Sequence, residues 1–495
     1  MGSRIRPIRA RPWPERPAGE LVGDLEGPVA AVGADGTVEP LGSPWRVGWA
    51  VGAEDRWHVA AEEAAVRTRL VDDMPVVATA MKVPGGDVVL RAAAGLTAGG
   101  RSVVLEFTNA SPVPVSLAVG VTGSIHSAAA KGSCLLADGR VAVDLGCAPG
   151  GTVAVDNGET WPAIRAEPPR RDCEARSRAG LASAAAVVPL VPGAPLRTTV
   201  PIDGGAVAGS SPEEIAAGWR VVVERAASLD LPDEAAVRTW RRGIAASVLG
   251  AGSAEPLAAA RAAAVLDRVG LPDEADRARE VLVGAAGRSR LPPPAAAAAL
   301  RALASRRLRA GRVSPLADWA GPLAEAAAAG GCLDPITLEQ VAAALETEEP
   351  SAARDARRLL ATTTSTASMS PAASSADGLA KAVRNSLAFG GDGVAGVEAL
   401  LDCLVTESAD RLVVLPAPSE AWNRAPVDAR SLVTRHGVLS FSVRWHGSRP
   451  ALLWELPTVK GQDSSGTTVC CGLDQSWRSE ARAGEALLEP GTIGA

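Results

Sequence analysis

Tyrosine is absent from this chain of 495 residues, which has only three phenylalanines and four histidines. The histidines, at positions 58, 126, 436 and 446, have no spacing typical of a metal-binding pair, and this argues against a zinc site. The sequence also lacks a GxGxxG motif after a strand, a P-loop, an HExxH motif and a GxSxG nucleophile elbow. We therefore expect neither a metal ion nor a cofactor.

Long apolar runs and basic stripes are missing as well. No stretch reaches the roughly 18 apolar residues that suggest a membrane span. The net charge is −6, and no cationic stripe is present to neutralise phosphates. The sequence therefore predicts no membrane partner and no nucleic-acid partner.

Cysteine is sparse and irregularly placed. Seven cysteines form no CxxC pair, and the basic N-terminus MGSRIRPIRARPWPERP is not followed by an apolar signal segment. Scattered cysteines without a signal are typical of reduced thiols, so we expect a cytoplasmic protein. Residues 1–19 are expected to be flexible.

The hydrophobic fraction of 47% is enough for two or three domains, and the period of the apolar residues changes along the chain. Residues 20–205 are predicted to form a β-sandwich domain with many short strands and frequent turns. Within it, VVLEFTNASPVPVSLAVGV (Val103 to Val121) predicts two antiparallel strands around an Asn-Ala-Ser-Pro turn. The Trp57-His58 pair, beside charged residues, is expected to line the interface with the helical domain.

Helical signals dominate residues 211–408. SPEEIAAGWRVVVERAASLDL begins with serine, proline and two acids, and LPDEA at 231–235 and 271–275 repeats after the length of one helical hairpin. Nine or ten helices are expected. The segment 362–376 is expected to be a flexible loop.

The remaining residues, 411–495, are predicted to form a small antiparallel β-domain. In GVLSFSVRWHG, the alternation places Leu439, Phe441, Val443 and Trp445 on a buried face, and Trp454 on the partner strand joins them. Arg444 is expected to face solvent or a salt partner. His436 and His446 then lie at opposite ends of one strand, which makes them hairpin residues and not a catalytic pair.

The chain resembles the bacterial six-hairpin glycosidase-like proteins. The resemblance rests on WAVGAEDRWHVAAEEAAVRTRLVDDMPVVATAMKVPGGD and FTNASPVPVSLAV, on AAAVLDRVGLPDEADRAREVL and AAALRALASRRLRAG, and on RLVVLPAPSEAWNRAPVDARSLVTRHGVLSFSVRWHGSRPALLWEL with CGLDQSWRSEARAGEALL. It implies a multidomain β + α fold with an N-terminal antiparallel β-sandwich, an α/α helical-hairpin toroid and a C-terminal antiparallel β-domain. A complete six-hairpin toroid has twelve helices, so the nine or ten expected here imply a degenerate and shortened member with an incomplete toroid.

Sugar hydrolysis in such a family requires two carboxyl groups at the mouth of the toroid, with aromatic platforms. Glu255 and Asp318 are the catalytic candidates and Trp319 the substrate-binding candidate. The other acids considered are Asp230, Asp334, Glu348 and Glu349, of which Asp230 and Asp334 are better explained as acids at helix starts. Three prolines and five alanines (292–299) stand where related proteins carry acidic and aromatic residues.

Two hypotheses follow. The favoured one is a catalytically eroded relative kept for binding carbohydrate or protein, or for self-association through the helical domain. The alternative is an active cytoplasmic glycosidase that uses an Asp/Glu acid–base pair on an oligosaccharide or glycoside.

Overall fold

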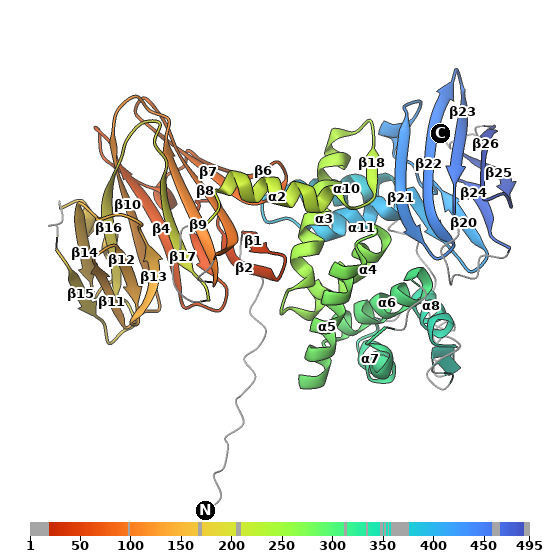
Figure 1. The fold of residues 1–495 in the computed structure, drawn as a ribbon, viewed down its shortest axis with the longest axis horizontal. Coiled ribbons are helices and arrows are strands. Elements are labelled where there is room, and N and C mark those ends of the chain that lie inside the picture. Colours follow the sequence, from red (N-terminus) through yellow and green to blue (C-terminus); the bar gives the residue numbers. More distant parts are fainter. Residues whose placement is uncertain are drawn as a thin grey trace, which may run out of the picture.

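The computed structural model describes residues 19–97, 100–166, 171–203, 209–310, 314–332, 335–346, 350, 353–354, 356–357, 376–457 and 466–489. In these residues a β-sandwich, a helical array and a C-terminal β-region follow one another along the chain (Figure 1). This is the fold class that the sequence predicts. The predicted mobility of 1–19 and 362–376 falls almost entirely on residues outside this description.

The β-sandwich consists of two sheets with mainly valine, leucine and alanine between them. The eight-stranded sheet contains β1 (Glu20–Asp24), β2 (Gly27–Val32), β3 (Val38–Pro40), β4 (Trp45–Gly52), β5 (Trp57–Val59), β10 (Val115–Gly123), β14 (Gly151–Val155) and β16 (Ser183–Leu190). The nine-stranded sheet contains β6 (Val66–Val71), β7 (Met74–Val83), β8 (Gly86–Thr97), β9 (Gly100–Asn109), β11 (Ser127–Lys131), β12 (Cys134–Ala137), β13 (Arg140–Asp144), β15 (Cys173–Arg176) and β17 (Leu196–Pro201).

The strands predicted between Val103 and Val121 exist, but they do not pair with each other. β9 pairs with β8 and β17, whereas β10 pairs with β4 and β16 in the opposite sheet. The Asn109 side chain donates to Val113 O at 2.8 Å and Leu190 O at 3.2 Å, which fixes the crossing between the sheets. The prediction of a hairpin is wrong because alternation identifies a strand but not its partner.

The helical array begins after the sandwich and, in the described residues, comprises α2 (Pro212–Glu224), α3 (Glu234–Ala251), α4 (Pro256–Arg268), α5 (Pro272–Arg288), α6 (Pro293–Ala310), α7 (Ala320–Ala329), α8 (Pro335–Leu345), α10 (Ala376–Leu387) and α11 (Gly393–Leu404). Ser211 and Glu214 form a capping box at the start of α2, as the sequence signal predicts. The helix ends at Glu224, however, and Ser228–Asp230 forms strand β18. The expectation of a helix through this segment is therefore wrong.

The described helices form an open array and no closed ring. Helix α4 packs against α3, α5, α6 and α11, and α6 in turn packs against α7 and α8. Most alanines on the facing sides of α4 and α6, such as Ala263 and Ala296, are fully buried, and their small side chains let these helices approach closely.

The C-terminal β-region has two sheets. One contains β18, β21 (Val427–Thr434), β22 (Gly437–His446), β23 (Arg449–Glu455) and β26 (Ala483–Leu487), and the other contains β19 (Val405–Glu407), β20 (Arg411–Val414), β24 (Thr468–Cys471) and β25 (Asp474–Ser479). Strands β20 and β24 pair in parallel, so the prediction of a purely antiparallel domain is wrong in this detail. The reason is that the chain leaves the second sheet, builds β21–β23 of the first, and then returns.

The register of β22 agrees with the prediction. Leu439, Phe441 and Val443 are buried together with Trp454, which lies opposite Phe441 on β23. Trp445, near the strand end, is only partly buried. On the other face, Arg444 donates to Asp428 at 2.7 Å.

Candidate functional site

Glu255, the first catalytic candidate, is the N-cap of α4. Its carboxylate accepts hydrogen bonds from the backbone N–H groups of Leu257 at 3.0 Å and Ala258 at 2.7 Å. The position follows from the sequence Ser-Ala-Glu-Pro, since proline starts the helix and the acid satisfies its free N–H groups. The local role of Glu255 is therefore to cap a helix.

Asp318 and Trp319 lie together in a short 3-10 helix, η2 (Ala317–Trp319), that precedes α7. Asp318 is exposed, whereas Trp319 is partly buried and packs against the core of the helical array. A Cβ added at Gly287 of α5 would lie 3.9 Å from the Trp319 ring. The indole thus packs against neighbouring helices, as a core side chain does.

The other acids considered from the sequence are scattered. Asp230 ends β18 opposite Asp428 of β21, in the C-terminal sheet, and the cap of α3 is Asp233 instead. Asp334, Glu348 and Glu349 lie outside the described residues. No contact described here brings two of the predicted acids together.

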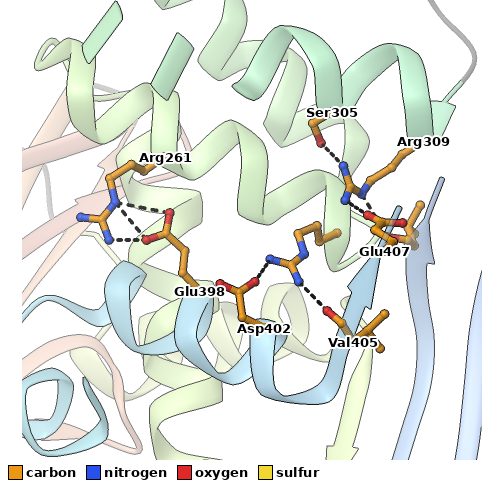
Figure 2. A network of polar contacts seen from close by, with 9 residues as sticks. Arg261, Ser305, Arg309, Glu398, Asp402, Val405 and Glu407 are labelled. Atoms are coloured by element: carbon orange, nitrogen blue, oxygen red, sulfur yellow. Dashed lines mark hydrogen bonds and ion pairs between the residues drawn. The ribbon is translucent and has the colours of Figure 1, made fainter. Parts of the chain in front are cut away.

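Arginines hold the carboxylates that lie between the helices (Figure 2). Arg261 of α4 donates to Glu398 of α11 at 2.5 Å and to Asp392 at 2.7 Å. About two turns further along α4, Arg268 donates to Asp402 at 2.7 Å and to the carbonyl of Val405 at 3.4 Å. Two ion pairs, Arg261–Glu398 and Arg268–Asp402, thus join α4 to α11.

A second cluster joins α6 to the C-terminal sheets. Arg309 donates to Glu407 of β19, to Ser305 Oγ at 3.1 Å and to the carbonyl of Val433 at 3.3 Å (Figure 2). Burial opposes the charged form of Glu407, but Arg309 and the backbone N–H of Arg435 outweigh it and lower the pKa of this carboxyl. Glu407 is therefore a buried carboxylate and not a proton donor.

The most deeply buried charge is Arg279 of α5, whose side chain is 0% exposed. It donates to Asp267, to Asp276 at 3.0 Å and twice to the carbonyl of Ala302. Arg306 of α6 donates to the other oxygen of Asp276 at 2.5 Å. These contacts link α4, α5 and α6 through paired charges, although Arg306 Nε is buried without a hydrogen-bond partner.

The histidines are structural residues, as the sequence predicts for the pair at 436 and 446. His436 is buried in the β21–β22 turn, and His446 is exposed at the far end of β22. Both ring nitrogens of His58 face carboxylates, Asp55 at 3.0 Å and Glu63 at 3.1 Å. The polar groups near His58 are paired, as expected. They lie beside α1 (Thr160–Ile164) on the sandwich, however, so the prediction that they line the interface with the helical domain is wrong.

The cysteines are free thiols, and two of them, Cys403 and Cys471, are buried. All seven cysteines are described and free, and burial raises the pKa of Cys403 and of Cys471 to about 11. Such thiols are protonated near neutral pH and are poor nucleophiles. Within the described residues, no group of three histidine, cysteine or acidic side chains is placed to hold a metal ion.

A hollow with a volume of about 580 Å³ lies at the far end of the sandwich and is wide open to solvent. Two of its lining carboxylates have local partners: Asp144 accepts from Ser133 Oγ and from the backbone of Gly146, and Asp172 accepts from the backbone of Gly132. No sequence pattern predicted this hollow, and none of the predicted site residues lines it.

No protein-family model matches the chain, and no curated protein matches it. Among solved structures, the structure is similar to that of a bacterial glucoamylase complexed with acarbose, with a TM-score of 0.47 and 10% sequence identity, over 72% of this chain and 69% of that chain. None of the helices described here meets the length and hydropathy needed to cross a membrane.

Proposed function

We propose that this chain is a catalytically eroded, glycoside-hydrolase-like protein that is retained for binding carbohydrate or protein in the cytoplasm. The observation that carries the proposal is the state of the carboxylates in the helical array. Arginines or helix N-termini bind them, and none of the predicted acids forms a facing pair in the described contacts.

Glycoside hydrolysis needs a carboxyl group that keeps its proton near neutral pH, beside a second carboxylate that attacks or activates water. A carboxyl group keeps its proton near neutral pH only in an apolar surrounding or beside another negative charge, because both raise its pKa. In this chain the carboxylates between the helices lie beside cations instead. Arginines pair with Asp267, Asp276, Asp392, Glu398, Asp402 and Glu407, and the pKa of Glu407 is lowered.

Space for a sugar is also scarce between the central helices. Where an inner helix of a sugar-binding toroid would present acids and aromatic rings, α6 presents Ala295 to Ala299, all at most 3% exposed. These side chains pack against α4 and leave no polar group to orient a sugar hydroxyl. The proposal therefore assigns binding to an outer surface and not to the middle of the array.

The test is an assay of sugar release by the purified full-length chain. The protein is incubated with a panel of aryl glycosides and disaccharides, and we expect no product above a heat-denatured control. The Glu255→Gln and Asp318→Asn variants should give the same result. Hydrolysis by the parent protein that disappears in either variant would overturn the proposal and establish the active glycosidase.

A further inference from the structure

The outer face of the nine-stranded sheet is only half covered. Helix α2 packs on one half, where Ile215 and Ala216 contact Val76 and Ala93 (Figure 1). Beyond that contact the face is open, and its side chains are charged or small. An open sheet face of this kind is a surface on which a ligand can lie.

One register row crosses five strands of this open face. Arg69 of β6 lies opposite Ala78 of β7, which lies opposite Arg91 of β8, then Glu106 of β9 and Arg197 of β17. Because residues directly opposite each other point to the same face, all five side chains share it. The three arginines stand on every second strand, about 9.5 Å apart.

The arginines of this row are accessible. Arg69 is exposed, and the side chains of Arg91 and Arg197 are 39% and 48% exposed. Glu106 between them is buried, accepting from Arg197 at 2.8 Å and lying 3.8 Å from Arg91. A single carboxylate thus holds two guanidinium groups in place on the sheet, and this preorganises them.

The whole open face carries an excess of positive charge. Lys82 of β7 also points to this side, and Arg67 of β6 is paired with Asp87 of β8 at 2.8 Å. Five cations therefore stand against three carboxylates, Asp87, Glu106 and Glu214, the last of which interacts with Arg197 from the start of α2. The local excess is two positive charges on a protein whose net charge is −6. Such a concentration of one sign attracts ligands of the opposite sign.

We propose that the arginine row, defined as Arg69, Arg91 and Arg197, is a binding surface for an acidic polysaccharide built from uronic acids. A guanidinium group binds a carboxylate with two parallel hydrogen bonds, and a uronic acid polymer offers carboxylates at regular intervals along an extended chain. Its remaining hydroxyl groups suit a floor of small and hydroxylated residues such as Ala78 and Thr108.

Other polyanions fit the face less well. Single-stranded nucleic acid is bound by stacking bases on aromatic rings, and the open part of this face presents none among its outward residues. Duplex nucleic acid needs many more phosphate contacts than three arginines give. A peptide added as a strand requires a free sheet edge, whereas the row lies across the sheet.

This inference goes beyond the proposed function, because it concerns the sandwich and holds whether or not the helical array hydrolyses sugar. The test uses the full-length chain and polygalacturonate as probe, in a titration at low salt. The Arg69→Gln, Arg91→Gln double variant should bind about tenfold more weakly than the parent or not at all. Arg197 is left in place because it holds the buried Glu106.

The matched control is the Arg46→Gln, Arg176→Gln double variant, which removes the same charge from exposed sites outside the row. It should bind polygalacturonate like the parent, and neutral dextran should not bind any of the three proteins. Binding should also weaken as salt rises. Equal thermal unfolding of the two double variants establishes that the loss is not one of folding.

Three outcomes would contradict the inference: no binding of polygalacturonate by the parent, equal losses in both double variants, or tighter binding of a DNA duplex than of polygalacturonate. The sugar-release assay is a separate measurement, so each proposal can fail while the other stands.

Discussion

At the scale of single residues, this protein buries several ionisable side chains, each with defined partners. His436 illustrates the pattern in the β21–β22 turn. Its Nε2 lies 2.9 Å from the carbonyl of Ser408, which requires an N–H donor, and its Nδ1 lies 3.0 Å from the hydroxyl of Thr467. The neutral imidazole satisfies both contacts, with Nδ1 accepting the hydroxyl proton.

Burial lowers the pKa of His436, although Glu407 and the carbonyl of Ser408 act in the opposite direction. The unfolded chain therefore takes up the proton first, near the ordinary value of about 6.5. The stability contributed by the neutral ring is complete above that pH and is lost as pH falls through the lower pKa of the folded state.

We predict that His436→Gln reduces the loss of thermal stability between about pH 7.5 and about pH 5, because glutamine cannot titrate but still donates to Ser408. Unfolding temperatures at the two pH values provide the measurement. The control is His446→Gln at the exposed end of the same strand, which should lose as much stability as the parent. Identical pH dependence in all three proteins would rule out this role for His436.

At the scale of elements, local sequence signals decide where the helices start. Ser211 forms a capping box with Glu214, Asp233 caps α3, and Asp392 caps α11. Glu255 belongs to this set, and its cap uses two backbone N–H groups. The same carboxylate that the sequence offers as an acid catalyst thus has a sufficient structural reason to be there.

Replacing Glu255 by alanine should therefore lower the free energy of unfolding by about 1 kcal/mol, the usual cost of a lost N-cap. Glu255→Ser should retain most of the stability, since serine also caps. Chemical denaturation of the purified variants measures both values. Glu325→Ala, an exposed position inside α7, is the matched control and should be close to neutral. No cost for Glu255→Ala would show that the cap is not stabilising.

At the scale of the whole molecule, the sandwich and the helical array are in direct contact. Arg242 of α3 donates to Glu20 of β1, which also accepts from the backbone of Gly390 at 2.8 Å. Nearby, the backbone of the β1–β2 turn approaches the end of α3 so closely that a Cβ at Gly252 would lie 1.9 Å from the carbonyl oxygen of Glu26. The two domains are thus joined by a buried ion pair and a backbone contact.

We predict that Gly252→Ala destabilises the protein by about 1–3 kcal/mol, because the added methyl group forces the two backbones apart. Calorimetry should show a lower unfolding temperature and a wider separation between the unfolding of the two domains. Gly218→Ala is the control, since its Cβ meets nothing within 4 Å and alanine favours the helix. If the Gly252→Ala protein were as stable as the parent, the two backbones at Gly252 and Glu26 could move apart at little cost, which would contradict the prediction.

The sequence by itself determined the order of β-sandwich, helical array and C-terminal β-region and which face of β22 is buried, because these depend on the period of apolar residues and on capping residues nearby in the chain. The alternation around Phe441 and the capping signal at Ser211 are examples. Only the tertiary structure decided which strand pairs with which.

β9 and β10 lie in opposite sheets, β18 leaves the helical region to join β21, and β20 pairs in parallel with β24. The same holds for charges: Arg261 and Glu398 are 137 residues apart, and the arginine row assembles from three strands. Periodicity is a local property, whereas pairing depends on the packing of distant surfaces, and for that reason the ion pairs and the row had no signal in the sequence.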